Sequence, residues 1–267
     1  MVGSVCAVAA ESVSINGCFA LSRRRIMGSP TTSNFPLKRW IWLAVFAAAF
    51  AWVESAVVID LREIFFAGDF QFPLVIVREA GVRVVDPLVK IEFGREIATL
   101  VMLISVAVLA GRNRLQRVCF FAVAFGIWDI FYYIWLRVLT GWPESLMTWD
   151  LLFYVPLPWV GPVITPVFIA LVMVVYGSLF LRAESLGYHV RFVWRDWLVL
   201  SACTVALIVA FCWDWQNILR LPGAAVRTGV PETFAWWLYV PALSAAVIYL
   251  TVRWRNFIQQ QDLAQRR

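Results

Sequence analysis

Six separate apolar runs of roughly twenty residues are the feature that most constrains how this chain can fold. A helix rises ~1.5 Å per residue, so a run of this length crosses the ~30 Å hydrocarbon core of a bilayer. The runs cover residues 40–59, 87–110, 118–139, 163–181, 197–213 and 234–252, and the fifth could continue to Leu219. They predict an all-α fold, a polytopic membrane bundle of about six transmembrane helices.

Composition supports lipid as the solvent of this chain. Hydrophobic residues make up 62% and charged residues 15% of the sequence, whereas soluble domains average roughly 45–50% apolar and about 25% charged. The fifteen Trp and seven Tyr suit a protein with many membrane–water interfaces, where such rings settle. The net charge of +6 is explained by membrane orientation, and no basic run with interleaved aromatics indicates a nucleic-acid partner.

Local signals place some helix ends and the segments outside the bundle. Asp86-Pro87 predicts an N-cap followed by a first-turn proline, Gly111 predicts a stop, and Pro241 predicts a kink. We expect a single transmembrane domain over residues 39–257, between a disordered cytoplasmic tail at 1–38 and a cytoplasmic C-terminal tail at 258–267. Met27 is an alternative start, because residues 27–38 already form a complete short N-terminus.

Two connections have the character of structured segments. Residues 60–86 are too short and too charged to cross the membrane, and we expect them to lie on the outer interface or dip into it. Residues 141–166 contain five prolines and no Lys or Arg. Their apolar stretch predicts a re-entrant or interfacial segment before helix four, which needs protein or water around its backbone.

The basic residues predict the orientation of the bundle. With the N-terminus inside, the inside segments carry fifteen Lys and Arg and the outside segments eight. Cytoplasmic loops carry such an excess, so we expect both termini in the cytoplasm. The acids show the opposite bias, with thirteen of seventeen outside or within the helices, so a site built from carboxylates would face outward.

Charges at membrane depth are the strongest functional signal. One ionised residue at a helix centre costs ~2.5–3.5 kcal/mol, and such residues mark function by default. The candidate binding residues form a polar cluster on helices one to three: Glu54, Arg95, Glu96, Asp129, Tyr133 and Arg137. Helical spacing places Glu92, Arg95, Glu96 and Thr99 on one face of helix two, and Asp129, Tyr133 and Arg137 on one face of helix three. We expect Glu54, Arg95, Glu96 and Asp129 to converge, with Arg95 in salt-bridge reach of Glu54 or Asp129, because its planar fork can serve two carboxylates. The alternative is an ion-pair network that only fixes helix packing.

The residue inventory excludes several kinds of chemistry. His189 is the only histidine and lies in a predicted loop, which argues against haem, zinc and di-iron sites and against a Ser–His protease. No phosphate-binding glycine motif is present, and the five cysteines form no C-x-x-C pair. We therefore expect no cofactor and no metal, and catalytic residues are not identified.

Two stretches, residues 51–62 (AWVESAVVIDLR) and 126–166 (including WDIFYYIWLRVLTGWPESLMTWDLLFYVPLPWVGPV), resemble an uncharacterised family of multi-helix bacterial membrane proteins. The resemblance implies a bacterial inner-membrane setting and no activity.

Three functions stay open from the sequence. The first is a small transporter or ligand-binding membrane protein whose partners are membrane lipid and a small-molecule or lipid ligand. The second is an intramembrane enzyme that uses a carboxylate acid or base on a lipid or isoprenoid substrate. The third is a structural or assembly subunit.

Overall fold

The computed structural model describes residues 36–65, 82–153, 157–186, 188, 190–213 and 233–265. These residues form six α-helices and two short strands, in the following order: α2 (Leu37–Phe65), α4 (Val82–Ala110), α5 (Arg114–Thr140), β1 (Trp149–Phe153), β2 (Trp159–Pro162), α6 (Ile164–Ser185), α7 (Trp194–Cys212) and α9 (Trp236–Gln265). Within this part of the chain, all six helices are long and apolar enough to cross a membrane. The predicted polytopic bundle of six helices is confirmed.

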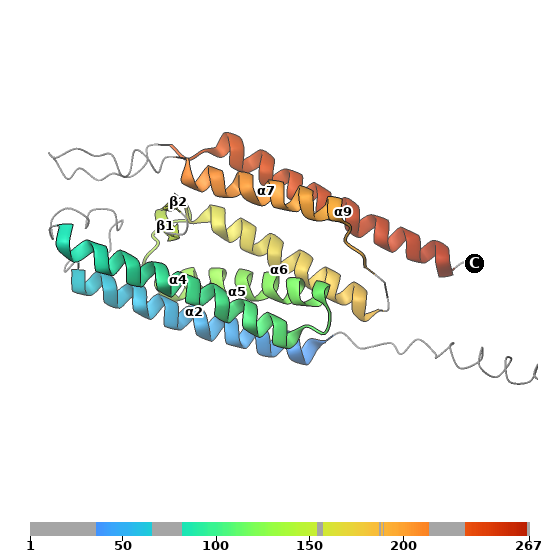
Figure 1. The fold of residues 1–267 in the computed structure, drawn as a ribbon, viewed down its shortest axis with the longest axis horizontal. Helices are drawn as coiled ribbons and strands as arrows, with labels where there is room; N and C mark the ends of the chain where they lie inside the picture. Colours follow the sequence, from blue (N-terminus) through green and yellow to red (C-terminus); the bar gives the residue numbers. More distant parts are fainter. Residues whose placement is uncertain are drawn as a thin grey trace, which may run out of the picture.

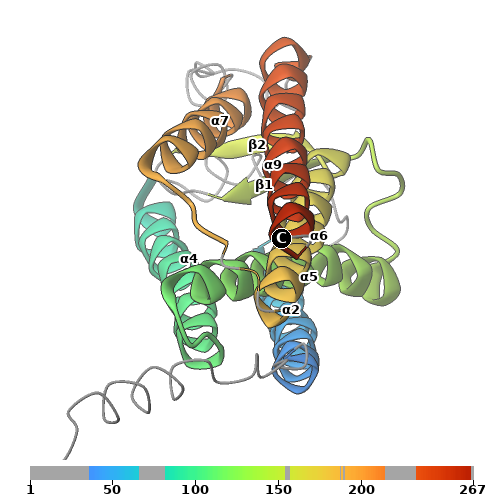
Figure 2. The same ribbon diagram turned by 90° about the vertical axis from the view of Figure 1, so that its right-hand side faces the viewer.

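Helix α5 is the centre of one half of the bundle. It packs against α2, α4 and α6, while α7 and α9 form a separate antiparallel pair (Figures 1 and 2). The start of α2 and the end of α9 lie at the same end of the bundle, as an even number of spans requires (Figure 1). The β-strands lie at the opposite end, between the α7–α9 pair and the remaining helices.

The ends of α5 follow directly from its sequence. The side chain of Asn113 accepts a hydrogen bond of 2.8 Å from the backbone N–H of Gln116 and caps the N-terminus. Gly141 adopts a left-handed conformation with φ of 76° and donates its N–H to the carbonyl of Arg137. The predicted stop at Gly111 is also confirmed, because α4 ends at Ala110.

Other boundaries differ from the sequence prediction. The predicted start of α4 at Asp86-Pro87 is wrong, because the helix begins at Val82 and takes in both residues. Helices α2 and α9 are longer than their apolar runs and continue to Phe65 and Gln265, so part of the expected C-terminal tail is helical. Charged helix ends carry no hydrophobic signal, which is why apolar runs underestimate helix length. The tail before residue 36 and most of the 60–86 connection lie outside the described residues.

The segment before α6 is a β-hairpin, which the sequence did not predict. Strands β1 and β2 pair antiparallel, with Asp150 opposite Gly161. The ring of Trp159 stacks on Phe211 of α7 at 5.9 Å, and Trp149 meets the ring of Phe234 at 6.4 Å. The two strands pair the backbone groups that face each other, and the hairpin packs against protein, which is the setting that non-helical backbone needs at membrane depth.

The α7–α9 pair is fastened at the end away from the hairpin by a buried acid. Asp196, 1% exposed, accepts a hydrogen bond from the hydroxyl of Tyr249 and pairs with the Arg253 guanidinium at 2.9 Å. It also caps α7 by accepting the backbone N–H of Val193 at 2.6 Å. The carboxylate of Asp196 therefore caps the N-terminus of α7 and also binds α7 to α9.

Two glycines allow α5 and α6 to approach closely. A Cβ on Gly126 would lie 2.5 Å from the carbonyl oxygen of Ala170, and one on Gly177 would lie 2.9 Å from the carbonyl oxygen of Cys119. Small residues at such contacts are the usual way for transmembrane helices to gain van der Waals packing.

We predict that Gly126→Ala destabilises the protein by about 1–3 kcal/mol, because the new methyl group pushes the α6 backbone away. Gly94→Ala on α4 is the matched control, since nothing lies within 4 Å of a Cβ there. Thermal unfolding of the purified protein in detergent measures the difference. Equal unfolding temperatures for the two variants would show that the close α5–α6 contact is not required.

Candidate intramembrane polar site

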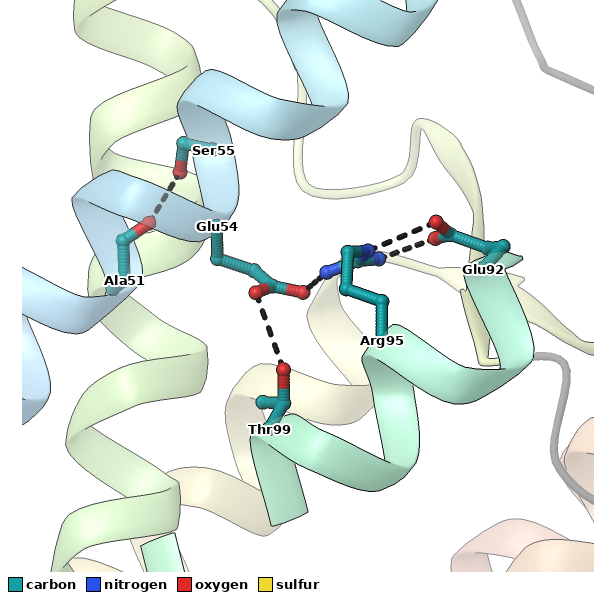
Figure 3. Close-up of polar contacts among 6 residues, drawn as sticks. All are labelled: Ala51, Glu54, Ser55, Glu92, Arg95 and Thr99. Atoms are coloured by element: carbon teal, nitrogen blue, oxygen red, sulfur yellow. Dashed lines mark hydrogen bonds and ion pairs between the residues drawn. The ribbon is translucent and has the colours of Figure 1, made fainter. Parts of the chain in front are cut away.

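Arg95 of α4 joins two carboxylates that come from two helices. Its Nη1 atom forms an ion pair with Oε1 of Glu54 on α2, and its Nε atom donates a hydrogen bond of 2.9 Å to Oε2 of Glu92 on α4 (Figure 3). A second bond, from Nη2 to Oε1 of Glu92, completes a bidentate pair. The predicted salt bridge between Arg95 and Glu54 is confirmed, and the guanidinium fork does serve two acids.

Hydrogen bonds around Glu54 connect α2 to α4 and α5. Thr99, one turn from Arg95 on the same face of α4, places its hydroxyl 3.4 Å from Oε2 of Glu54 (Figure 3). The adjacent Ser55 is fully buried, and its hydroxyl donates to the carbonyls of Ala51 at 2.8 Å and Tyr132 of α5 at 3.2 Å. Three helices thus meet at one polar level of the bundle.

This polar level lies within the apolar spans. Arg95 is five residues inside the span Lys90–Ala110, or ~8 Å from its end, and Glu54 is seven residues inside Leu37–Leu61, or ~10 Å. The side chain of Glu54 is 9% exposed, that of Glu92 16% and that of Arg95 21%. Arg95 and Glu92 are therefore reachable from outside the protein while Glu54 lies behind them.

Glu96 is buried on the inner side of this group. It is 4% exposed and interacts electrostatically with both Arg95 and Glu92. It follows Arg95 directly in sequence and comes one turn after Glu92, as the stripe of charges on α4 predicted.

Asp129 belongs to a second group, centred on α5 and the hairpin. Its side chain is 6% exposed, and its Oδ2 atom has no hydrogen-bond partner among the described residues. Tyr133, one turn further along the same face, donates a hydrogen bond of 3.1 Å to Oδ2 of Asp150, which is 1% exposed. Asp150 also interacts electrostatically with Asp129. The structure therefore places Asp129 with Asp150 and Tyr133, and not in contact with Arg95.

Arg137 does not join either group. It is exposed, and its guanidinium donates to the carbonyl oxygens of Gly141 and Pro143, the latter at 3.0 Å. The sequence placed it two turns from Asp129 on one stripe, but its long side chain turns to the carbonyls at the C-terminal end of α5. This is a common position for arginine, because it offsets the partial negative charge of a helix end.

Sequence reasoning missed two members of the site. Glu92 and Thr99 lie on the same α4 stripe as Arg95, but only the structure shows that they bind the ion-pair partners. Asp150 had a weaker signal. The dipeptide Trp149-Asp150 repeats Trp128-Asp129, and the structure brings both aspartates to one place.

The site offers no evident metal centre. Among the described residues, no group of three or more His, Cys, Asp or Glu side chains is arranged to hold a metal ion. His189, the single histidine, lies outside that part of the chain.

Comparison with known proteins finds no family model that matches the chain, no similar curated protein and no similar solved structure. The function therefore has to be argued from the geometry of the site.

We predict that Arg95→Ala lowers the free energy of unfolding by about 3 kcal/mol, because it leaves two carboxylates in the membrane domain without their counter-ion. Glu54→Gln should cost less, since Glu92 still pairs with Arg95. Lys90→Ala, an exposed change on the same helix, is the control and should stay within about 0.5 kcal/mol of the unaltered protein. Chemical or thermal unfolding in detergent ranks the three. If Arg95→Ala matched the control, the ion pairs would contribute nothing to stability.

Proposed function

We propose that this is a small transporter or ligand-binding membrane protein that receives its ligand at the intramembrane group formed by Glu54, Glu92, Arg95, Glu96 and Thr99. The ligand is a small molecule or lipid with a polar or charged group, because such a group can exchange with the ion pairs of Arg95. A dry structural network would instead be fully enclosed and fully paired.

The partial exposure of Arg95 carries this proposal. Its guanidinium binds two acids on two helices, yet its side chain is still 21% exposed at membrane depth. An exposed charge facing hydrocarbon costs several kcal/mol, so it faces water or a polar ligand. The buried part of the site, Glu54 and Thr99, adjoins Arg95, and Glu54 is its ion-pair partner.

The orientation completes the proposal. With the basic residues of the sequence inside, both termini are cytoplasmic, and the end of the bundle that carries the hairpin and Arg95 faces outward. We place the protein in a bacterial inner membrane with the site open to the external side.

Reporter fusions test this orientation. Alkaline phosphatase, active only outside the cytoplasm, should be active when fused after Thr148 and inactive when fused after Gly187. The reason is the Lys and Arg asymmetry between the two sides. The reverse pattern would invert the topology and turn the site toward the cytoplasm.

Cysteine accessibility tests the site itself. Starting from a variant without the five native cysteines, Glu92→Cys should react with a charged, membrane-impermeant thiol reagent added outside, because its position opens to water. Ile97→Cys is the matched control on α4, since Ile97 is 42% exposed and faces lipid. It should react far more slowly, because a thiol in hydrocarbon forms little thiolate.

The reactivity of Glu92→Cys also distinguishes a transporter from a ligand-binding protein. A transporter predicts that Glu92→Cys also reacts in inside-out vesicles, since the site alternates between the two sides. A binding protein predicts reaction from the outside only. Reaction from neither side would mean a sealed network and would contradict the proposal.

A further inference from the structure

Asp129 stands apart from the site around Arg95, and its surroundings point to a different ligand. We infer that Asp129 is a proton-binding site of the membrane domain, with the proton held on its carboxyl group. This inference does not rest on the proposed function, because it concerns a different side chain and can be tested without any transported ligand.

The position of Asp129 makes an ionised carboxylate expensive there. It lies on α5, the helix packed against α2, α4 and α6, and is eleven residues, or ~16 Å, from the end of that helix at Thr140. That distance is about half of a ~30 Å hydrocarbon core. With 6% of the residue exposed, water cannot solvate the charge.

Hydrogen bonding within the described part of the chain leaves one oxygen of the Asp129 carboxyl group unsatisfied. The Oδ2 atom of Asp129 is buried and has no hydrogen-bond partner within the described residues. A carboxylate normally accepts several donors when it is buried, and one that accepts none on an oxygen loses the full solvation of that atom. A bound proton removes the charge and with it most of the penalty.

The charged and titratable groups on the surrounding elements do not supply a counter-ion to Asp129. They include Glu54 and Asp60 on α2, Lys90, Glu92, Arg95 and Glu96 on α4, Tyr132, Tyr133 and Arg137 on α5, Tyr176, Arg182 and Glu184 on α6 and Asp150 on β1. Among the described residues, the ion pairs of the structure join none of these cations to Asp129. Arg95 is engaged by Glu54 and Glu92, and the group that acts on Asp129 is another acid, Asp150. Two neighbouring carboxyl groups in a buried place do not both ionise readily.

A proton suits this place better than a metal ion. Calcium takes six to eight oxygen ligands and magnesium about six. No suitable group of three or more ligands occurs in the described parts of the chain. One carboxyl group is enough to bind a proton. Tyr133 lies one turn nearer than Asp129 to the C-terminal end of α5 and donates its hydroxyl to Asp150 of the hairpin, so exchangeable groups lie between Asp129 and that end of the helix.

Infrared spectroscopy can see this proton directly. The full-length protein is placed in vesicles of ether-linked phospholipids, which have no ester carbonyl to mask the C=O stretch of a protonated carboxyl group. At pH 7 the unaltered protein should show this band, and Asp129→Asn should lose an intensity equal to one carboxyl group per chain. Asp60→Asn, at an exposed aspartate on α2, is the matched control and should keep the full band.

The infrared band and its response to the variants support or contradict a proton on Asp129. A band at pH 7 that falls in Asp129→Asn but persists in Asp60→Asn and Asp150→Asn supports the proton on Asp129. No band in the unaltered protein overturns the inference without any variant. A band of unchanged intensity in a folded Asp129→Asn also overturns it, because the proton would then belong to another carboxyl group. A band lost only in Asp150→Asn also overturns it, because the proton would then belong to Asp150. A band that appears only when Na⁺ is withdrawn would show a bound metal cation and equally contradict it.

Discussion

The cost of an unpaired charge in hydrocarbon is the constraint on which the rest of this structure depends. Arg95 can exist within the membrane span of α4 only because Glu54 and Glu92 surround its guanidinium. That requirement fixes which face of α2 and which face of α4 turn toward each other. Apolar side chains alone would not fix these rotations, since helices in lipid gain little from burying one apolar face instead of another.

Helix α5 packs against both members of this ion-paired α2–α4 unit and joins them to α6. It meets α6 through the close contact at Gly126, and its Trp135 indole donates to the carbonyl of Ala48 on α2 at 2.9 Å. At the hairpin end, the stacking of Trp159 on Phe211 connects α7 to this group. At the other end, Asp196 holds α7 to α9. Polar contacts are therefore few and placed where helices must be held in register, and between them the packing is apolar.

The candidate site was predictable in part, and the limits have physical causes. Helical periodicity placed Glu92, Arg95 and Thr99 on one face of α4, and the need for a counter-ion predicted the pair with Glu54, because both arguments use only local geometry and charge. The positions of Asp129 and Arg137 were harder to foresee. A long arginine side chain can reach either a distant acid or the carbonyls of its own helix end, and sequence spacing does not decide between them.

The sequence by itself determined the number of spans, the stop at Gly111 and the presence of charged residues within the apolar runs. These properties depend on hydrophobicity along the chain and on local backbone chemistry, which need no partner. Only the tertiary structure decided that Asp150 joins Asp129 and Tyr133, that residues 149–162 form a hairpin, and that α7 and α9 stand as a separate pair. Each of these depends on contacts between residues far apart in the sequence, and in a lipid solvent many helix arrangements bury similar apolar area. The few polar and close-packed contacts that select one arrangement become visible only once the helices are assembled.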